Sequence, residues 1–302
     1  MRIAIVGAGI AGIACARAIG PSHEVVVLDR GKVPGGRMAS RRFDGRYVDM
    51  GASYFTVRDP AFQAVVNDWA ARGLARPWTD TFAVYDGSWR DPKTGPQRWA
   101  APGGLRSLVA DLADGVAVRQ QVHVEHVTPR SVDGEAFDAV VLAMPDPQAL
   151  PLLDASLRGA IDGRAWDPVL VLAARWAART WDWDGVFVHD DPVIEWVADD
   201  GARRGDGAAV LTAHSSPTFA LPRLAVPAEA ADSLVAAVRR LGLPAPEEVL
   251  RVQRWTYAKP VGERAELFRL EDGLGFCGDS WGAARVETAW RSGTALGHAL
   301  SS

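Results

Sequence analysis

The chain has 302 residues, enough for one large domain or two domains of ordinary size. Its 48% apolar and 23% charged residues are typical of a soluble globular protein and exclude disordered and fibrous classes. The net charge of −4 gives no basic field for nucleic acid, and no apolar run approaches the roughly 18 residues of a membrane span. Two cysteines, Cys15 and Cys277, cannot build a disulfide framework, so we expect a cytoplasmic protein without nucleic-acid or membrane partners.

The amino end predicts a strand, a tight glycine turn and a helix. Arg2–Val6 is β-branched and apolar, small residues follow over Ile10–Ile19, and residues 23–28 form a second apolar strand. Such continuous apolar strands are typical of a parallel sheet that is covered on both faces. The same segment imitates a secretory signal peptide with a cleavage-like site at 14–16, but its three glycines favour a folded strand, turn and helix.

Periodicity and turn residues predict the remaining elements. Residues 31–51 show no helical period and indicate an extended loop, and residues 81–99 indicate hairpins. We expect helices at 61–72, 104–113, 228–241 and 289–300. Further strands are expected at 116–127, 137–143, 169–176, 185–189, 208–214, 249–255 and 274–277.

The turn after the first strand carries the pattern G-x-G-x-x-G. In this spacing Gly7 permits the turn, Gly9 lets a pyrophosphate approach the backbone, and Gly12 lets the helix pack against the strand. The N-terminal end of the helix that begins at Ile10 offers unpaired N–H groups and a partial positive charge to that pyrophosphate. Asp29 lies 20 residues after Gly9, at the end of the second strand, where it can accept hydrogen bonds from ribose hydroxyls. These features together predict a bound dinucleotide.

Other patterns narrow the class of protein. Residues 273–278 also match G-x-G-x-x-G, but they fall within an apolar strand and no helix follows, so we expect a single dinucleotide site. No C-x-x-C is present, which argues against a disulfide reductase. Asp133-Gly134 indicates a hairpin turn rather than the NADPH-associated motif of aromatic hydroxylases, which argues against a monooxygenase.

The order of elements predicts an α/β protein with two discontinuous domains. Residues 1–56, 97–148 and 265–302 are expected to form a Rossmann-type dinucleotide-binding domain with a parallel sheet and helices. Residues 57–96 and 149–264 are expected to form an inserted α+β substrate domain with an antiparallel sheet. Twelve tryptophans, concentrated in the middle strands, indicate a second core or an aromatic-lined cavity.

Eight further motifs are spread over the whole chain. They are GGR (35–37), DMGASYF (49–55), WAAPGG (99–104), DAVVLAMP (138–145) with PQ (147–148), AHSSP (213–217), RWTYAKP (254–260), FCGD (276–279) and RVETAWRSG (285–293). The set resembles the flavin-containing amine oxidase superfamily, and most closely its bacterial renalase-type members. The resemblance implies a fold like that of glutathione reductase and p-hydroxybenzoate hydroxylase, with FAD as cofactor. Because both cysteines fall in predicted core elements, the FAD is expected to be non-covalent.

The resemblance also implies which residues hold FAD. It places Gly7, Gly9, Ile10, Ala11, Gly12, Asp29, Arg30, Gly36 and Arg37 at the adenosine and pyrophosphate, the Val122 backbone at adenine, Gly51, Ala52 and Ser53 along the isoalloxazine, Gly278 and Asp279 at the ribityl chain or pyrophosphate, and Val286 and Glu287 at the pyrimidine edge. A helix that begins near Glu287 would direct its positive end at the reduced, anionic flavin. The alternatives are a solvated loop charge for Arg37, a turn former for Asp279 and a first-turn helix charge for Glu287.

The implied activity is oxidation of the 2- and 6-dihydro isomers of NAD(P)H to NAD(P)+. Hydride would pass to flavin N5 and then electrons to O2, giving hydrogen peroxide. The alternatives are an amine oxidase or desaturase-like enzyme on another small molecule, or a flavin-binding protein without catalysis. No metal-ligand spacing is visible, so no metal is expected.

Four residues are candidates for contact with the substrate. His214 ends a predicted strand, Tyr54 adjoins the flavin loop, and Trp255 and Tyr257 share one strand face because they lie two residues apart. The alternatives are a structural histidine and aromatic core packing. The sequence assigns no role to Lys259 and favours a surface position for Arg41 and Arg42.

Overall fold

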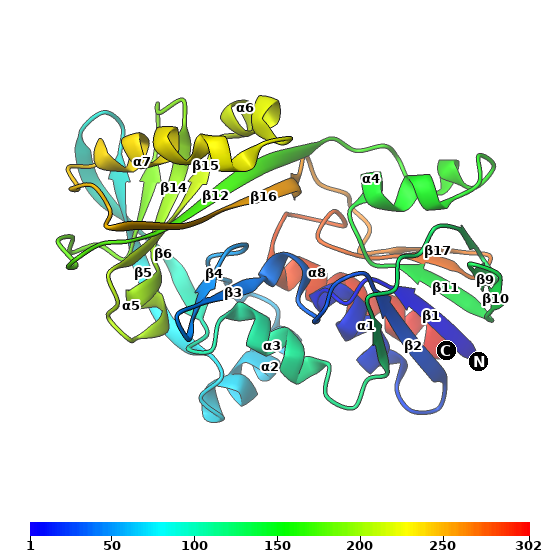
Figure 1. Cartoon of the computed structure of the whole chain (residues 1–302). Coiled ribbons are helices and arrows are strands. Elements are labelled where there is room, and N and C mark those ends of the chain that lie inside the picture. The colour runs from blue at the N-terminus through cyan, green and yellow to red at the C-terminus, as the bar shows by residue number, and fades with distance from the viewer.

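A mainly parallel sheet forms around the apolar strands predicted at the amino end (Figure 1). The computed structural model describes residues 1–302. The strand order is β17 (Arg269–Glu271), β18 (Leu274–Phe276), β11 (Ala139–Leu142), β1 (Arg2–Val6), β2 (Glu24–Asp29) and β7 (Val118–Gln120), and only β17 is antiparallel to its neighbour. The central strands β1 and β11 are buried on both faces, as their unbroken apolar sequences predict.

Helices α1 (Ile10–Ile19) and α8 (Val286–Ser301) pack against each other although they come from opposite ends of the chain (Figure 1). Their backbones approach at glycines: a Cβ added to Gly293 would lie 1.9 Å from the Ala11 carbonyl oxygen. A Cβ added to Gly297 would lie 2.5 Å from the Cys15 carbonyl oxygen. Only glycine permits this separation, which brings both helix N-termini to one edge of the sheet. The sequence located α1 correctly and placed the start of α8 three residues late.

An antiparallel sheet forms the second lobe. Its order is β16 (Glu248–Pro260), β12 (Trp166–Arg175), β15 (Val210–Ser215), β14 (Ile194–Asp199), β13 (Gly185–Val188), β5 (Arg76–Tyr85) and β6 (Trp89–Ala100), and only β13 and β5 pair in parallel. Alternate residues of β12 face opposite sides of this sheet. Leu170 and Leu172 pack under α7 (Ala231–Arg239). Val169 and Val171 lie on the other face, where they pack with Val48 and Met50. This period of two leaves the inner face available to line a site.

Short elements complete the chain. They are β3 (Ser40–Phe43), β4 (Arg46–Asp49), α2 (Pro60–Ala71), α3 (Leu105–Leu112), β8 (Val127–Thr128), β9 (Ser131–Val132), β10 (Glu135–Ala136), α4 (Asp146–Ala149), α5 (Asp200–Arg204) and α6 (Pro217–Ala220), with 3₁₀ turns at Gly36–Met38, Leu150–Leu152, Arg158–Ala160, Leu221–Arg223 and Pro227–Ala230. Asp133 and Gly134 form the predicted turn, between β9 and β10. None of the helices combines the length and apolar character needed to cross a bilayer.

The structure corrects several sequence interpretations. Of residues 116–127, which were expected as strand, only 118–120 and 127 are in strands. Residues 31–51 are not an extended loop but contain the β3–β4 hairpin, because Asp44 (φ 47°) and Gly45 (φ 85°) form its turn at positive φ. Strands alternating with turns were expected over residues 168–213, and β14 fits that pattern, but helix α5 was not expected. Strand β6 continues to Ala100, so residues 97–100 belong to the antiparallel sheet rather than to the dinucleotide-binding domain.

The contact between α1 and α8 predicts a specific stability effect. Gly293→Ala should lower the free energy of unfolding by about 2 kcal/mol, because overpacking at the Ala11 carbonyl outweighs the small gain in helix propensity. Urea unfolding followed by circular dichroism measures the change. Gly163→Ala is the matched control, since no atom lies within 4 Å of its added Cβ. Equal stability of the two variants would contradict the close helix contact.

Candidate functional site

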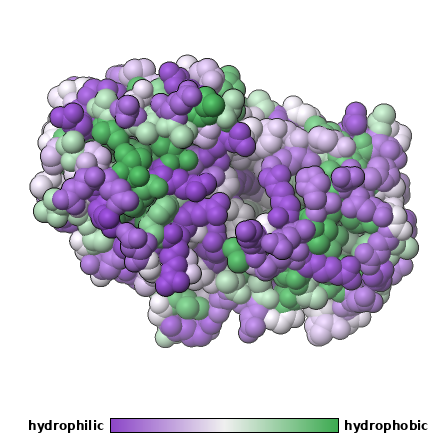
Figure 2. Space-filling model, in the orientation of Figure 1, coloured by the Kyte–Doolittle hydropathy of each residue, from purple (hydrophilic) through white to green (hydrophobic).

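A cavity of about 1620 Å³ lies between the two sheets. It begins where the strands of the parallel sheet end, at Gly7 and Asp29, and reaches His214 and Trp255 on the antiparallel sheet. Figure 2 shows a hollow between the lobes with hydrophilic residues around it. The volume exceeds the ~300–1,000 Å³ of an ordinary small-molecule pocket. It therefore has room for a dinucleotide together with a second molecule.

The glycine turn leaves its backbone open toward this cavity. Gly7 has φ +114°, and an added Cβ would lie 2.5 Å from the Ala143 carbonyl oxygen, so this position requires glycine. A Cβ on Gly9 would meet no protein atom within 4 Å. Ile10 and Ala11, the first residues of α1, also line the cavity. The turn and the helix end therefore fit a pyrophosphate, as the sequence predicted.

The carboxylate of Asp29 organises the backbone at the end of the cavity beside the glycine turn. It accepts hydrogen bonds from the Ala8 N–H (2.7 Å) and the Gly31 N–H (2.6 Å). An ionised carboxylate has further lone pairs, so ribose hydroxyls can still donate to it. Val122 lines the cavity, but its N–H already donates to the Asp29 carbonyl at 3.0 Å, which leaves the Val122 carbonyl to face a ligand. Arg30 lines the cavity beside them.

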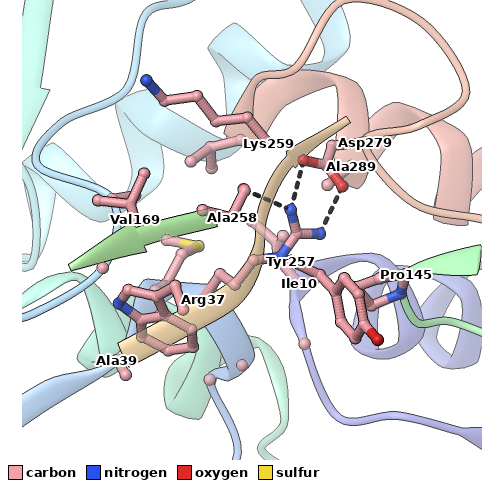
Figure 3. Close-up of a pocket in the computed structure, with 18 of the residues that line it drawn as sticks. Ile10, Arg37, Ala39, Pro145, Val169, Tyr257, Ala258, Lys259, Asp279 and Ala289 are labelled. Atoms are coloured by element: carbon pink, nitrogen blue, oxygen red, sulfur yellow. Dashed lines mark hydrogen bonds and ion pairs between the residues drawn. The ribbon is translucent and has the colours of Figure 1, made fainter. Parts of the chain in front are cut away.

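Arg37 and Asp279 form a two-pronged ion pair across the cavity wall (Figure 3). Arg37 Nη1 donates to one carboxylate oxygen at 2.7 Å, and Nη2 donates to the other at 2.5 Å. Nη1 also donates to the Ala258 carbonyl at 3.1 Å. Both residues line the cavity, so they hold each other in place there and are not a solvated charge and a turn former. The Gly278 N–H donates to Ser292 Oγ at 2.9 Å, which fastens the same loop to α8.

The loop of Gly51, Ala52 and Ser53 is held from both lobes. The Ala52 N–H donates to the Arg37 carbonyl oxygen at 2.9 Å, and a Cβ added to Gly51 would lie 1.9 Å from that oxygen. From the antiparallel sheet, Trp196 Nε1 donates to Ser53 Oγ at 3.0 Å. From α5, Arg203 Nη1 donates to the Ser53 carbonyl at 2.9 Å. All three loop residues line the cavity.

A buried ionic network supports this loop. Arg203 is completely buried and donates to Asp200 at 2.5 Å, and Asp200 also pairs with Arg46 at 2.6 Å and Arg204 at 3.0 Å. Burial raises the pKa of Asp200, but the three guanidinium charges outweigh burial and hold the pKa below its usual value. The sequence did not reveal this network, because consecutive arginines in a short helix resemble an ordinary solvated surface.

His214 faces the cavity from β15. Its Nε2 lies 3.4 Å from Ser53 Oγ. Burial, with the nearby positive charges of Lys259 and Arg203, lowers the His214 pKa to about 3. The ring is therefore neutral at physiological pH and can donate or accept a hydrogen bond without adding charge.

Tyr54 belongs to an aromatic cluster on the same wall. Its ring centroid lies 5.8 Å from Trp196 and 5.3 Å from Phe82. Burial raises the Tyr54 pKa, whereas the charges of Arg98 and Arg285 act in the opposite direction. The phenol is therefore protonated at neutral pH and faces the cavity as a hydrogen-bonding group.

Trp255 and Tyr257 both line the cavity from β16, as their spacing predicted. Trp255 Nε1 donates to the Met50 carbonyl at 2.5 Å, which fixes the indole beside the loop of Gly51, Ala52 and Ser53. Lys259, two residues further along the strand, also lines the cavity (Figure 3). Its Nζ lies 3.6 Å from Glu195. The sequence had assigned Lys259 no role.

The first two residues of α8, Val286 and Glu287, differ in their position relative to the cavity. Val286 lines the cavity, but Glu287 does not. The buried Glu287 carboxylate accepts the backbone N–H groups of Arg58 (2.6 Å) and Asp59 (2.7 Å), so it fastens α8 to the turn before α2. The carboxylate therefore points away from the cavity, and the placement of Glu287 at the pyrimidine edge of the flavin stays a prediction. Gly12 also lies outside the cavity. A Cβ there would lie 2.0 Å from the Gly7 carbonyl oxygen, so this glycine lets α1 pack closely against the turn that follows β1.

Several other lining residues escaped the sequence analysis. They are Arg41, Arg98, Phe187, Trp196 and Arg285. The alternation in IEWVAD (194–199) was a usable signal for Trp196, because it predicts a strand. Arg41 was expected at the surface. Arg98 and Phe187 carry no local pattern, since strand pairing directs them inward, and Arg285 lies at the N-cap of α8.

Neither cysteine lines the cavity. Cys15 and Cys277 are both buried in the core between the parallel sheet and its helices. A hydrogen bond with Cys15, together with burial, raises the pKa of the Cys277 thiol. Neither side chain is therefore placed for attachment to a ligand in this cavity.

Comparisons with known proteins agree with this architecture. Residues 5–69 match the family described as NAD(P)-binding Rossmann-like domain. A 4,4'-diapophytoene desaturase (4,4'-diaponeurosporene-forming) of Staphylococcus haemolyticus is 34% identical over 90 residues, which is 28% of this chain and 18% of that relative. The chain therefore matches only a small part of the desaturase.

Solved structures match over nearly the whole chain. They include a putrescine oxidase A394C mutant (TM-score 0.76, 16% identity, 99% of this chain and 98% of that one), an oxidoreductase from Methanosarcina mazei (0.75, 12%, 98% and 99%) and a CLA-producing fatty acid isomerase from P. acnes (0.73, 12%, 98% and 97%). This protein shares their fold. The fold is a Rossmann-type α/β domain combined with an antiparallel sheet, as the sequence predicted.

The buried histidine predicts a pH dependence of stability. The unfolded chain binds a proton at His214 near pH 6.5, whereas the folded protein resists protonation down to about pH 3, so stability falls as the pH drops below 6.5. Between pH 7.5 and 5.5 the wild type should lose about 1 kcal/mol more unfolding free energy than His214→Asn. Urea titrations at both pH values measure this difference. His298→Asn, at an exposed histidine, is the control, and a wild type that behaves like His214→Asn would contradict the buried, neutral ring.

Proposed function

We propose that the protein is an FAD-dependent oxidoreductase that removes hydride from a small organic molecule, in the manner of an amine oxidase or desaturase. The observation that carries this proposal is the single cavity that joins the glycine turn to the inner face of the antiparallel sheet. The motif set at the two ends of the chain supports FAD as the dinucleotide. The similarity to proteins named as a desaturase, a putrescine oxidase and an oxidoreductase supports redox chemistry.

The chain offers a binding group for each part of FAD. Gly9 and the start of α1 would hold the pyrophosphate, and Asp29 would accept the ribose hydroxyls. The loop at Gly51 and the start of α8 at Val286 would enclose the isoalloxazine. The cofactor would be non-covalent, because no cysteine lines the cavity. When bound, the flavin supplies the hydride acceptor.

The protein would contribute orientation and electrostatics. Trp255 and Tyr257 can flank a planar group, and His214 can hydrogen-bond it without introducing charge. The positive end of α8 favours negative charge at the cofactor end of the cavity. These residues would hold the reacting carbon close to the acceptor, within the ~3–3.5 Å that hydride transfer requires.

A second candidate function is oxidation of dihydronicotinamide isomers, the 2- and 6-dihydro forms of NAD(P)H, with O2 as electron acceptor. The size and charge of the cavity favour it. Ten Lys or Arg residues line the cavity against five Asp or Glu, although the whole chain is acidic. A second dinucleotide carries phosphate charges that match such a surface.

FAD binding can be tested at a position that the fold tolerates. Gly9 has extended backbone angles (φ −78°, ψ 176°) and free space at its Cβ, so Gly9→Ala should fold normally while its methyl group occupies the pyrophosphate site. We expect the variant to bind FAD about tenfold more weakly. Flavin absorbance of the purified protein and FAD released on denaturation are the measurements. Gly163→Ala is the control, and a colourless wild type that releases no flavin would overturn the proposal.

The two candidate substrates can be separated by anaerobic mixing. Rapid bleaching of the flavin by amines such as putrescine and benzylamine, and not by borohydride-derived NADH isomers, is the result expected of an amine oxidase. Bleaching by the isomers alone, with hydrogen peroxide formed in air, is the result expected of the second candidate. His214→Ala should change the bleaching rate in either case, because the ring faces the cavity.

A further inference from the structure

Arg98 is a buried positive charge without a carboxylate partner. It lies on β6 with 7% of its surface exposed and lines the cavity. No carboxylate oxygen lies within 4.0 Å of its guanidinium nitrogens. The other buried arginines differ in this respect, because Arg203 and Arg204 both pair with Asp200. An unpaired buried charge is costly, so a counter-charge from outside the protein would stabilise it.

The guanidinium of Arg98 is held in a fixed position. It donates to the Asp80 carbonyl oxygen, and its central carbon lies 4.2 Å from the centroid of the Phe82 ring. These contacts orient the group but leave its charge uncompensated. Arg98 is therefore preorganised to bind an anion rather than free to turn into solvent.

Arg98 lies at the aromatic part of the cavity wall. Its charge and that of Arg285 both act on Tyr54, which places the two guanidinium groups near the phenol. Trp196 packs with its ring centroid 5.8 Å from Tyr54 and 5.1 Å from Phe187. A planar apolar group can therefore lie against these rings with an attached anion close to Arg98.

Of the acidic lining residues on this side, Glu195 and Asp191 are already engaged, and Asp190 is exposed. Glu195 faces Lys259 at 3.6 Å, and Asp191 pairs with Arg240 at 2.6 Å. A free cationic amine would thus find few unpaired carboxylates here, whereas an anion finds Arg98 and Arg285. The local charge favours an anionic ligand, opposite in sign to the chain as a whole.

We propose that Arg98, assisted by Arg285, binds a carboxylate or phosphate group of a substrate whose planar apolar part lies against Tyr54, Phe187 and Trp196. This proposal rests on the proposed function, because it takes this part of the cavity as the substrate site. It assigns the substrate to the class of aromatic or otherwise flat anions. Arg98 acts here as a specificity residue and takes no part in the redox step.

Calorimetry on the purified flavin-containing protein tests the proposal with four matched probes: benzoate, phenyl phosphate, benzamide and benzylammonium. We expect at least one of the two anions to bind about tenfold more tightly than benzamide, and added salt to reduce that preference. The better anion identifies the group, carboxylate or phosphate. Equal binding of the anions and benzamide, or tighter binding of benzylammonium, would overturn the proposal.

Two variants locate the effect. Arg98→Met should reduce the anion preference to within about twofold while benzamide binding persists, which shows that the site still folds. Arg254→Gln removes a charge from the same cavity at an exposed position, where the side chain donates to the Leu224 carbonyl, and should keep the preference. An Arg98→Met protein that keeps the preference refutes the assignment.

Two further measurements keep the test decisive. If circular dichroism shows that Arg98→Met is unfolded, Arg285→Gln takes its place and should lower the preference about threefold; an unchanged preference then counts against the proposal. Calorimetry measures binding and requires no turnover. Its result is therefore independent of the flavin-bleaching experiment that tests the proposed function. A protein without flavin would contradict FAD dependence while the comparison of anions remains measurable.

Discussion

The close packing of α1 against α8 is the constraint on which the site depends. Gly293 and Gly297 let the two helix backbones approach closely, so segments nearly three hundred residues apart meet at one edge of the sheet. Both helices then present their N-termini to the same cavity. The Arg37–Asp279 ion pair makes a second connection between the two ends of the chain. A dinucleotide site can therefore form only after the chain has closed on itself.

The inserted sheet contributes to the site as much as the Rossmann-type domain does. Trp196 and Arg203 hold the Ser53 loop from the second lobe, while the Arg37 carbonyl holds it from the first. Burial of the Arg203 and Asp200 charges costs desolvation free energy, which offsets much of their attraction. The ion pair by itself therefore adds little to the stability of the fold. Its position favours a role in holding the loop at a defined distance from His214.

Charge is distributed unevenly in this protein. The chain is acidic overall, but basic residues outnumber acidic ones two to one around the cavity. Burial, helped by nearby positive charges, lowers the pKa of His214 and keeps it neutral, and the buried Arg98 has no carboxylate partner. The cavity is therefore suited to anionic ligands, and one dinucleotide does not account for the arginine on the antiparallel sheet.

The sequence by itself determined the glycine turn, the strand before it, helix α1 and the position of Asp29 at the end of the second strand, because these follow from local steric rules and fixed spacing. It also determined that Trp255 and Tyr257 share a face, since the period of a strand is two. Only the tertiary structure decided where Glu287 points, that Lys259 reaches the cavity and that Arg98 is buried without a partner. Those features depend on which distant strands and helices pack together, and no local pattern encodes that packing.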